Sequence, residues 1–196
     1  MRFGDEDESA PMLGRRGFLN LGLAALAAAT VPPLLLSPAT AEAAPLLGAS
    51  TRRLALHNIN TGERFDEVYW ANGAYRPDAL RKLDVLLRDH RAQQICRTDP
   101  RLFDVLWQVR ERLDSDEAYQ VICGYRSRKT NALARRRKRG VAKESYHTRG
   151  MAVDVILPER GLKAVAQQAM ALEAGGVGFY PRSNFVHMDV GPVRSW

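Results

Sequence analysis

Two segments of the chain carry side chains that could bind a metal ion. In the first, His147 and Asp154 are seven residues apart, with a glycine between them and an alternating apolar run that begins after it. In the second, alternation predicts a strand that places His187 and Asp189 on the same face. An imidazole nitrogen or a carboxylate oxygen binds zinc at about 2.0–2.2 Å, and a catalytic zinc usually has three protein ligands. The pattern therefore predicts one zinc ion, bound by His147, Asp154 and His187.

Four sequence blocks, in a fixed order along the chain, carry a family resemblance. They are Ile-Cys-Gly-Tyr-Arg-Ser at 122–127, Ser-x-His-x-x-Gly-x-Ala-x-Asp at 145–154, Gly-Gly-Val-Gly-Phe-Tyr-Pro at 175–181, and the ending from 185 to 196. They resemble the zinc-site region of the superfamily that groups lysostaphin, D-Ala-D-Ala metallopeptidases and the hedgehog signalling domain. Within it, the chain resembles the YcbK-like, MepK-type murein endopeptidases. The resemblance implies a zinc peptidase, an endopeptidase or a carboxypeptidase, that cuts amide bonds in murein peptide stems or cross-links during cell-wall remodelling.

The resemblance also implies roles for two residues outside the ligand set. Arg126 occupies the arginine position of the Gly-Tyr-Arg-Ser motif, where the relatives use it to approach the substrate and stabilise negative charge. A guanidinium suits that role because it binds carboxylates in a bidentate way and stays charged near neutral pH. Ser145 stands two residues before the first ligand, where the relatives place a serine that contacts substrate. The structural alternatives are a salt bridge for Arg126 and a loop contact for Ser145.

The residue that would act as general base does not follow from the family pattern. The related D-Ala-D-Ala dipeptidases have a glutamate three residues before the third ligand, and here that position is Asn184. Asp189 is the nearest acidic replacement, because two residues along a strand return a side chain to the same face about 6.5–7 Å away. The alternative is that Asp189 orients the metal-bound His187, a frequent role of carboxylates beside metal ligands.

Two classes of function fit these residues. A zinc with three protein ligands and no evident fourth donor has an open position, whereas structural zinc sites usually have four protein ligands. Bound water at such a zinc has a pKa near neutrality, and the metal polarises a peptide carbonyl, so amide hydrolysis is the leading reaction. The alternative is a non-catalytic, zinc-containing module that binds the cell wall, as the signalling use of the hedgehog domain illustrates.

The hydrophobic periodicity predicts an α+β domain, a mainly antiparallel sheet with helices packed on one face, which the resemblance makes hedgehog-like or D-Ala-D-Ala-peptidase-like. A turn at 60–63 predicts a β-hairpin from the segments on either side of it. The expected helices are 77–90, 100–113, 130–138 and 162–174, and the expected later strands are 119–123, 151–157, 177–180 and 185–191. Asp99 is the expected N-cap of the second helix, with Pro100 as its first residue.

Charge and cysteine content restrict the partners. The net charge is +7, and outside the first 43 residues 26 basic and 17 acidic residues leave +9, which favours anionic polymers such as the acidic stems of murein. The basic run 135–139 does not predict a nucleic-acid site, because base-reading motifs and stacking aromatics are absent around it. With only Cys96 and Cys123, no disulfide framework is expected, and Cys123 is expected to be a small apolar residue of a core strand.

The first 43 residues resemble a cleaved twin-arginine signal peptide. Arg15 and Arg16 precede an apolar stretch rich in leucine and alanine, and small-x-small triplets follow at 39–41 and 41–43. An uncleaved membrane anchor is the alternative, although two prolines interrupt the apolar stretch. We therefore expect 1–43 to be removed, the domain 44–196 to act in the periplasm without stable membrane insertion, and the precursor to use the twin-arginine export machinery.

Overall fold

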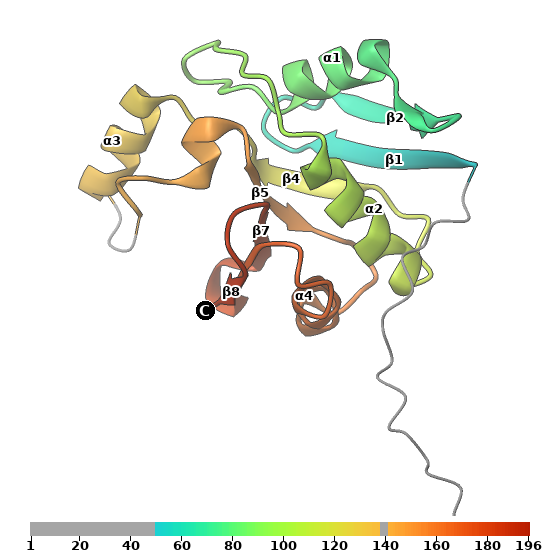
Figure 1. The fold of residues 1–196 in the computed structure, drawn as a ribbon. Coiled ribbons are helices and arrows are strands. Elements are labelled where there is room, and N and C mark those ends of the chain that lie inside the picture. The colour runs from blue at the N-terminus through green and yellow to red at the C-terminus, as the bar shows by residue number, and fades with distance from the viewer. Residues whose placement is uncertain (1–49, 138–140) are drawn as a thin grey trace, which may run out of the picture. The chain divides into compact units, whose positions relative to one another are not determined.

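The computed structural model describes residues 50–137 and 141–196, so the expected signal peptide at 1–43 lies outside the described residues. The described chain is an α+β fold built on one mixed sheet (Figure 1). Its strands are β1 (Thr51–Asn58), β2 (Arg64–Ala71), β3 (Ala74–Tyr75), β4 (Tyr119–Cys123), β5 (Ala152–Ile156), β6 (Gly176–Tyr180), β7 (Phe185–Asp189) and β8 (Arg194–Ser195). Its α-helices are α1 (Pro77–Leu86), α2 (Arg101–Arg112), α3 (Arg128–Arg137) and α4 (Leu162–Met170). The expected fold class is therefore confirmed.

The strand order in the sheet is β3-β2-β1-β4-β5-β7-β6-β8. The pairs β1–β4 and β6–β8 are parallel, and the other pairs are antiparallel, so the sheet is mainly antiparallel as expected. The strands that carry the predicted ligands, β5 and β7, are neighbours near the middle of the sheet. This central position gives the predicted ligands a rigid base.

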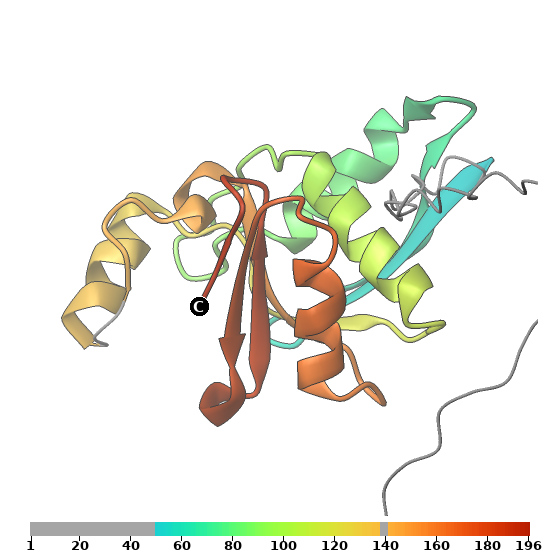
Figure 2. The same cartoon turned by 60° about the horizontal axis from the view of Figure 1, so that its bottom comes forward.

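Helices α1, α2 and α4 cover one face of the sheet (Figures 1 and 2). Each turns an apolar stripe inward, as the buried Ala79, Leu83 and Leu86 of α1 illustrate with their spacing of four and three residues. The strands supply the other half of this core through alternate residues, such as Val153 and Val155 of β5. Because side chains alternate along a strand, the residues between these core positions point to the opposite face of the sheet.

Helix α3 differs from the other three helices. Its buried residues are Thr130 and Asn131 alone, and it stands to one side of the sheet (Figures 1 and 2). Its side chains therefore contribute little to the apolar core. No helix among residues 50–137 and 141–196 is long and apolar enough to cross a membrane.

The expected element boundaries needed small corrections. The helix expected at 130–138 begins at Arg128, and the helix expected at 162–174 ends at Met170, after which turns lead to β6. Pro100 is the N-cap of α2 instead of its first residue, although the Asp99 carboxylate still accepts a hydrogen bond from the Arg101 backbone N–H at 3.1 Å. Helix ends fray, and such shifts by one or a few residues leave the packed face unchanged.

Candidate metal centre

The pairing of four strands places the candidate site in one row across the sheet. Asp154 of β5 pairs with His187 of β7 on one side and with Cys123 of β4 on the other, and His187 pairs in turn with Gly178 of β6. Directly opposed residues share a face of the sheet. Since Val153 and Val155 face the helices, Asp154 and its row face the other way. The helices therefore support the strands without covering the site.

His147 comes from outside the sheet. It belongs to the short 3-10 helix η1 (Tyr146–Arg149), which ends at Gly150, a residue with a left-handed backbone (φ 66°). A Cβ at Gly150 would lie 2.6 Å from the carbonyl oxygen of Arg97, so a larger residue fits neither the backbone conformation nor the space. This tight turn brings His147 back over the start of β5. The glycine in the His-x-x-Gly-x-Ala-x-Asp pattern thus has a geometric reason.

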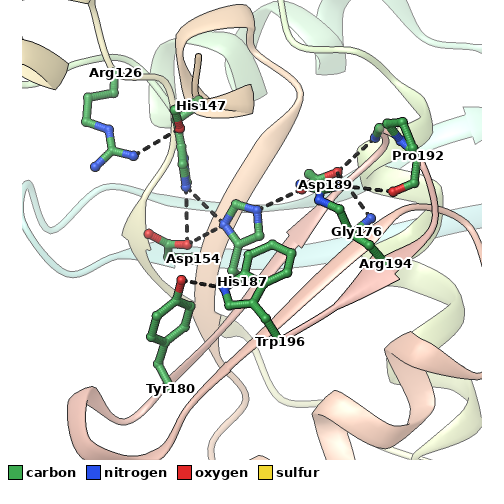
Figure 3. Close-up of polar contacts among 12 residues, drawn as sticks. Arg126, His147, Asp154, Gly176, Tyr180, His187, Asp189, Pro192, Arg194 and Trp196 are labelled. Atoms are coloured by element: carbon green, nitrogen blue, oxygen red, sulfur yellow. Dashed lines mark hydrogen bonds and ion pairs between the residues drawn. The ribbon is translucent and has the colours of Figure 1, made fainter. Parts of the chain in front are cut away.

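Three ligand atoms meet at this point. His147 Nε2 lies 3.2 Å from Asp154 Oδ1 and 3.2 Å from His187 Nδ1, and His187 Nδ1 lies 2.9 Å from Asp154 Oδ1 (Figure 3). Ligands at about 2.0–2.1 Å from a tetrahedral zinc stand about 3.3 Å apart, so this triangle has nearly the dimensions that zinc requires. The structure brings together all three residues predicted as ligands.

The outer atoms of both imidazoles are engaged in ways that fix their tautomers. His147 Nδ1 lies 2.8 Å from the carbonyl oxygen of Gly124, and His187 Nε2 lies 2.9 Å from Asp189 Oδ2. A carbonyl and a carboxylate only accept hydrogen bonds, so both outer nitrogens carry the proton. The two inner nitrogens then point lone pairs toward the Asp154 carboxylate. Three acceptors this close need a cation among them, either a proton or a metal ion.

The pKa shifts agree with this demand for positive charge. Burial alone would lower the pKa of His147, but the nearby Asp154 carboxylate and Cys123 outweigh burial and hold that pKa well above its ordinary value. Burial alone would raise the pKa of Asp154, yet His147 and His187 hold it below its ordinary value. The cluster therefore favours charged partners, and its nitrogen and oxygen donors fit zinc.

Asp189 lies behind His187, on the side away from the other two ligands. Its side chain is 0% exposed. Beyond the bond to His187, Oδ1 accepts hydrogen bonds from the backbone N–H groups of Gly176 and Gly191 at 3.1 and 2.9 Å, and Arg194 pairs with Oδ2 at 2.6 Å (Figure 3). Burial would raise its pKa, but His187, Arg194 and the Gly191 N–H hold it below its ordinary value. Asp189 Oδ2 thus contacts the outer nitrogen of His187, which is the contact that an orienting role requires.

Arg126 lies at the edge of the same cluster (Figure 3). Its backbone N–H donates to the His147 carbonyl at 3.1 Å, and its guanidinium donates to Ser145 Oγ at 3.2 Å. Its Nε is buried and has no hydrogen-bond partner among the described residues, and it forms no salt bridge with them. Arg126 therefore keeps donor capacity beside the metal ligands, while Ser145 accepts from it.

The loop that carries Arg126 is fixed by Gly124 and Ser127 of the 122–127 block and by Asp89, which the sequence patterns did not indicate. Gly124 passes so close to the chain at Leu87 that an added Cβ would lie 2.4 Å from the Leu87 carbonyl oxygen. The buried Asp89 accepts a hydrogen bond from the Ser127 backbone N–H at 2.9 Å, and the Ser127 hydroxyl accepts from the Thr130 N–H at 3.2 Å. The Ser-x-x-Thr spacing was visible in the sequence, but the contact with Asp89 spans 38 residues and has no local signal.

Cys123 was also missed as a site residue. Its Sγ lies within 4.8 Å of ligand atoms of His147 and Asp154, and it is half-buried instead of being a core residue. Cys123 lies in the expected strand, but the expected core position is not observed, because a bulge in the β4–β5 pairing places Cys123 opposite Asp154. Both cysteines are free in the structure, so no disulfide joins Cys96 to Cys123.

An aromatic pair forms another side of the site. The Trp196 ring lies 5.3 Å from the His187 ring, and its Nε1–H donates to the Tyr180 hydroxyl at 2.7 Å (Figure 3). A Cβ at Gly178 would lie 2.8 Å from the Trp196 ring, so the glycine beside His187 provides the space that the indole occupies. Trp196 remains 49% exposed, which leaves an apolar surface next to the ligands.

Comparison with known proteins shows which proteins the chain is similar to. The sequence profile of the family described as peptidoglycan L,D-endopeptidase MepK matches residues 47–196. A probable peptidoglycan L,D-endopeptidase MepK of Haemophilus influenzae is 42% identical over 183 residues, which cover 93% of this chain and 95% of that protein. The peptidoglycan L,D-endopeptidase MepK of Escherichia coli K12 is 43% identical over 182 residues, which cover 93% of this chain and 96% of that protein.

Proposed function

This chain belongs to the peptidoglycan L,D-endopeptidase MepK family, and from that premise we propose that it is a zinc peptidase that hydrolyses amide bonds in peptidoglycan during cell-wall remodelling. The observation that carries the proposal is the triangle formed by His147 Nε2, Asp154 Oδ1 and His187 Nδ1, whose sides are 2.9–3.2 Å. Its size and donor types fit one zinc ion with a position left for water. The relatives' names point to a bond between an L-configured and a D-configured centre.

The metal would supply a water of lowered pKa and polarise the scissile carbonyl. His147 and His187 would bind it through their inner nitrogens, because the Gly124 carbonyl and the Asp189 carboxylate accept hydrogen bonds from their outer N–H groups. We assign Asp189 to this orienting role, since its remaining acceptor sites are taken by backbone N–H groups and Arg194.

Arg126 is proposed to bind the negative charge of the substrate or the oxyanion that forms during hydrolysis. Its unpartnered Nε and its position beside His147 support this role. Ser145 is proposed to aim the guanidinium through the contact at 3.2 Å, and it can also contact the substrate peptide. A guanidinium that is held in position can stabilise developing charge with little reorganisation.

The substrate implies action outside the cytoplasm, and we propose export to the periplasm through the twin-arginine route. The support is Arg15-Arg16 before the apolar stretch, which lies outside the described residues. Replacing both arginines with lysine should leave uncleaved precursor in the cytoplasm. Normal export of that variant would point to the general secretory route.

Digestion of purified peptidoglycan, with product masses identified by mass spectrometry, tests the activity. We expect peptide fragments from L,D cleavage, loss of cleavage with a chelator, and recovery with added zinc. The His187→Ala variant should release none, whereas His90→Ala, which replaces a histidine outside the cluster, should act normally. Binding to peptidoglycan without any released fragment, at full zinc occupancy, would favour the non-catalytic binding module instead.

A further inference from the structure

Helix α3 has a charge pattern that the catalytic site does not explain. Its ten residues include five cations and no anion: Arg128, Lys129, Arg135, Arg136 and Arg137. All five side chains are exposed, and none forms an ion pair with a partner in residues 50–137 or 141–196. A solvated helix more often mixes both signs, because opposite charges four residues apart stabilise it.

The stability of the helix does not require this pattern. Arg128 and Lys129 occupy the first turn, where the helix dipole disfavours positive charge. The last three arginines are better placed for the dipole, yet they are consecutive and repel one another. Most helices in proteins are stabilised by packing of an apolar face. The buried residues of α3 are the polar Thr130 and Asn131, so this helix gains little stability from apolar burial. Binding of an external anionic partner would account for this concentration of positive charge.

The helix is nevertheless held firmly next to the candidate active site. Ser127 caps its first turn by accepting from the Thr130 N–H, and the same Ser127 is fixed to Asp89. The Asn131 side chain donates to the carbonyls of Ala142 and Lys143 at 3.1 and 3.2 Å, in the segment that leads to Ser145. The cations thus lie on the Arg126 side of the metal ligands, with Arg126 two residues before the helix.

We propose that the cationic surface of α3, formed by Arg128, Lys129 and Arg135–Arg137, docks the acidic peptide stems of the peptidoglycan network beside the bond being cut. Ten helical residues extend about 15 Å, so the cations at the two ends of α3 present positive charge over that length. The inference deepens the proposed function and rests on peptidoglycan as the substrate. It assigns α3 to binding of the polymer, separately from the hydrolysis at the metal centre.

The test variant replaces Arg135, Arg136 and Arg137 with glutamine, which has nearly the same helix propensity as arginine. A charge-conserving variant replaces the same three residues with lysine. The matched control replaces Arg64, Arg81 and Lys163 with glutamine, three exposed cations on other elements that also form no ion pair with described residues. Circular dichroism and metal content establish that each zinc-loaded protein is folded.

Binding to intact peptidoglycan sacculi is measured by co-sedimentation in the cold at about 0.15 M ionic strength. Each exposed charge pair contributes roughly a factor of two to five in affinity, so the glutamine triple variant should bind about 10-fold or more weakly. The lysine variant and the control should stay within about threefold of the unmodified protein. Cleavage of a short, soluble, cross-linked muropeptide should be unchanged in all three, because none of these residues contacts the metal ligands.

Several outcomes would overturn the proposal. Sacculus binding by the glutamine triple variant equal to that of the unmodified protein would remove α3 from polymer binding, and an equal loss in the control would reduce the effect to net charge. Tighter binding of the unmodified protein to vesicles of phosphatidylcholine and phosphatidylglycerol than to sacculi, lost in the triple variant, would identify a membrane partner instead. Failure of the unmodified protein to cut the muropeptide would refute the proposed activity, whereas the binding comparison would still decide the role of α3.

Discussion

Replacing Asp189 with asparagine tests how the metal centre is held. In the structure, Asp189 Oδ1 accepts from the N–H groups of Gly176 and Gly191, and Oδ2 accepts from His187 Nε2 at 2.9 Å. The asparagine carbonyl should keep the first position, where two backbone donors converge. The new NH₂ group then faces His187 Nε2–H and Arg194, so donors oppose donors.

The expected loss of zinc affinity follows from the tautomer of His187. To avoid the opposed donors, the ring must move its proton from Nε2 to Nδ1, the nitrogen that lies 2.9 Å from Asp154 Oδ1 in the cluster. A protonated Nδ1 cannot bind a metal. Loss of an orienting carboxylate typically weakens metal binding by about 10–100-fold, which is about 1.4–2.7 kcal/mol.

The assay is a zinc titration of Asp189→Asn, with bound metal and turnover measured on the same samples. We expect occupancy to need about 10–100-fold more free zinc, with most of the rate recovered once the site is full. Asp116→Asn, an exposed aspartate elsewhere, serves as the matched control and should titrate like the unmodified protein. A rate that stays about 10²–10⁴-fold low at full occupancy would refute our reasoning and restore Asp189 as the general base.

Three further predictions follow from other contacts. Arg126→Ala should lose roughly 100-fold in turnover while keeping its zinc content and melting temperature, and early melting would make Arg126 structural. Hydrogen bonds from the side chains of Thr130 and Ser127, and from the backbone N–H groups of Ser127 and Ala92, lower the pKa of Asp89 to about 2 despite its burial. Its contribution to the free energy of unfolding, about 2 kcal/mol, should therefore be present above about pH 4 and lost between about pH 4 and 2. Urea unfolding of Asp89→Asn as a function of pH should show a flatter acid limb, and an unchanged limb would contradict the assignment. Cys123 Sγ lies within 4.8 Å of ligand atoms of His147 and Asp154, a wider limit than the 2.9–3.2 Å that separate the atoms of the triangle. We therefore expect the thiol not to bind the metal, and the cobalt-loaded protein should lack a thiolate charge-transfer band. A band that disappears in Cys123→Ser would make the thiol a fourth ligand.

The three candidate ligands could be selected from the sequence because their signals are local. The seven-residue spacing around Gly150 and the alternation around His187 each depend on a few neighbouring residues. The pairing of Asp154 with His187 is different, because it depends on β5 and β7 becoming neighbours while β6 takes the outer place. No pattern within either strand encodes that choice.

The two roles weighed for Asp189 could not be separated from the sequence. Two residues along a strand place His187 and Asp189 on one face in either case. The distinction depends on which ring nitrogen meets the carboxylate, and the structure pairs Asp189 with Nε2 while Nδ1 faces Asp154. The two-residue strands β3 and β8 were missed for a simpler reason, since they are too short to show a periodicity.

The irregular pairing of β4 with β5 links the loop that carries Arg126 to the candidate ligands. Val121 pairs with Val155 and Cys123 with Asp154, so two steps along β4 match one step along β5. An unbroken register would instead have placed Ile122 opposite Asp154, and a shift of one residue exchanges the faces of all side chains that follow. The bulge lets β4 keep Val121 in the core while the chain beyond it turns toward His147. Bulges near active sites redirect side chains in this way. Here the redirected segment begins with Gly124, whose carbonyl accepts a hydrogen bond from His147 Nδ1–H, and leads directly to Arg126.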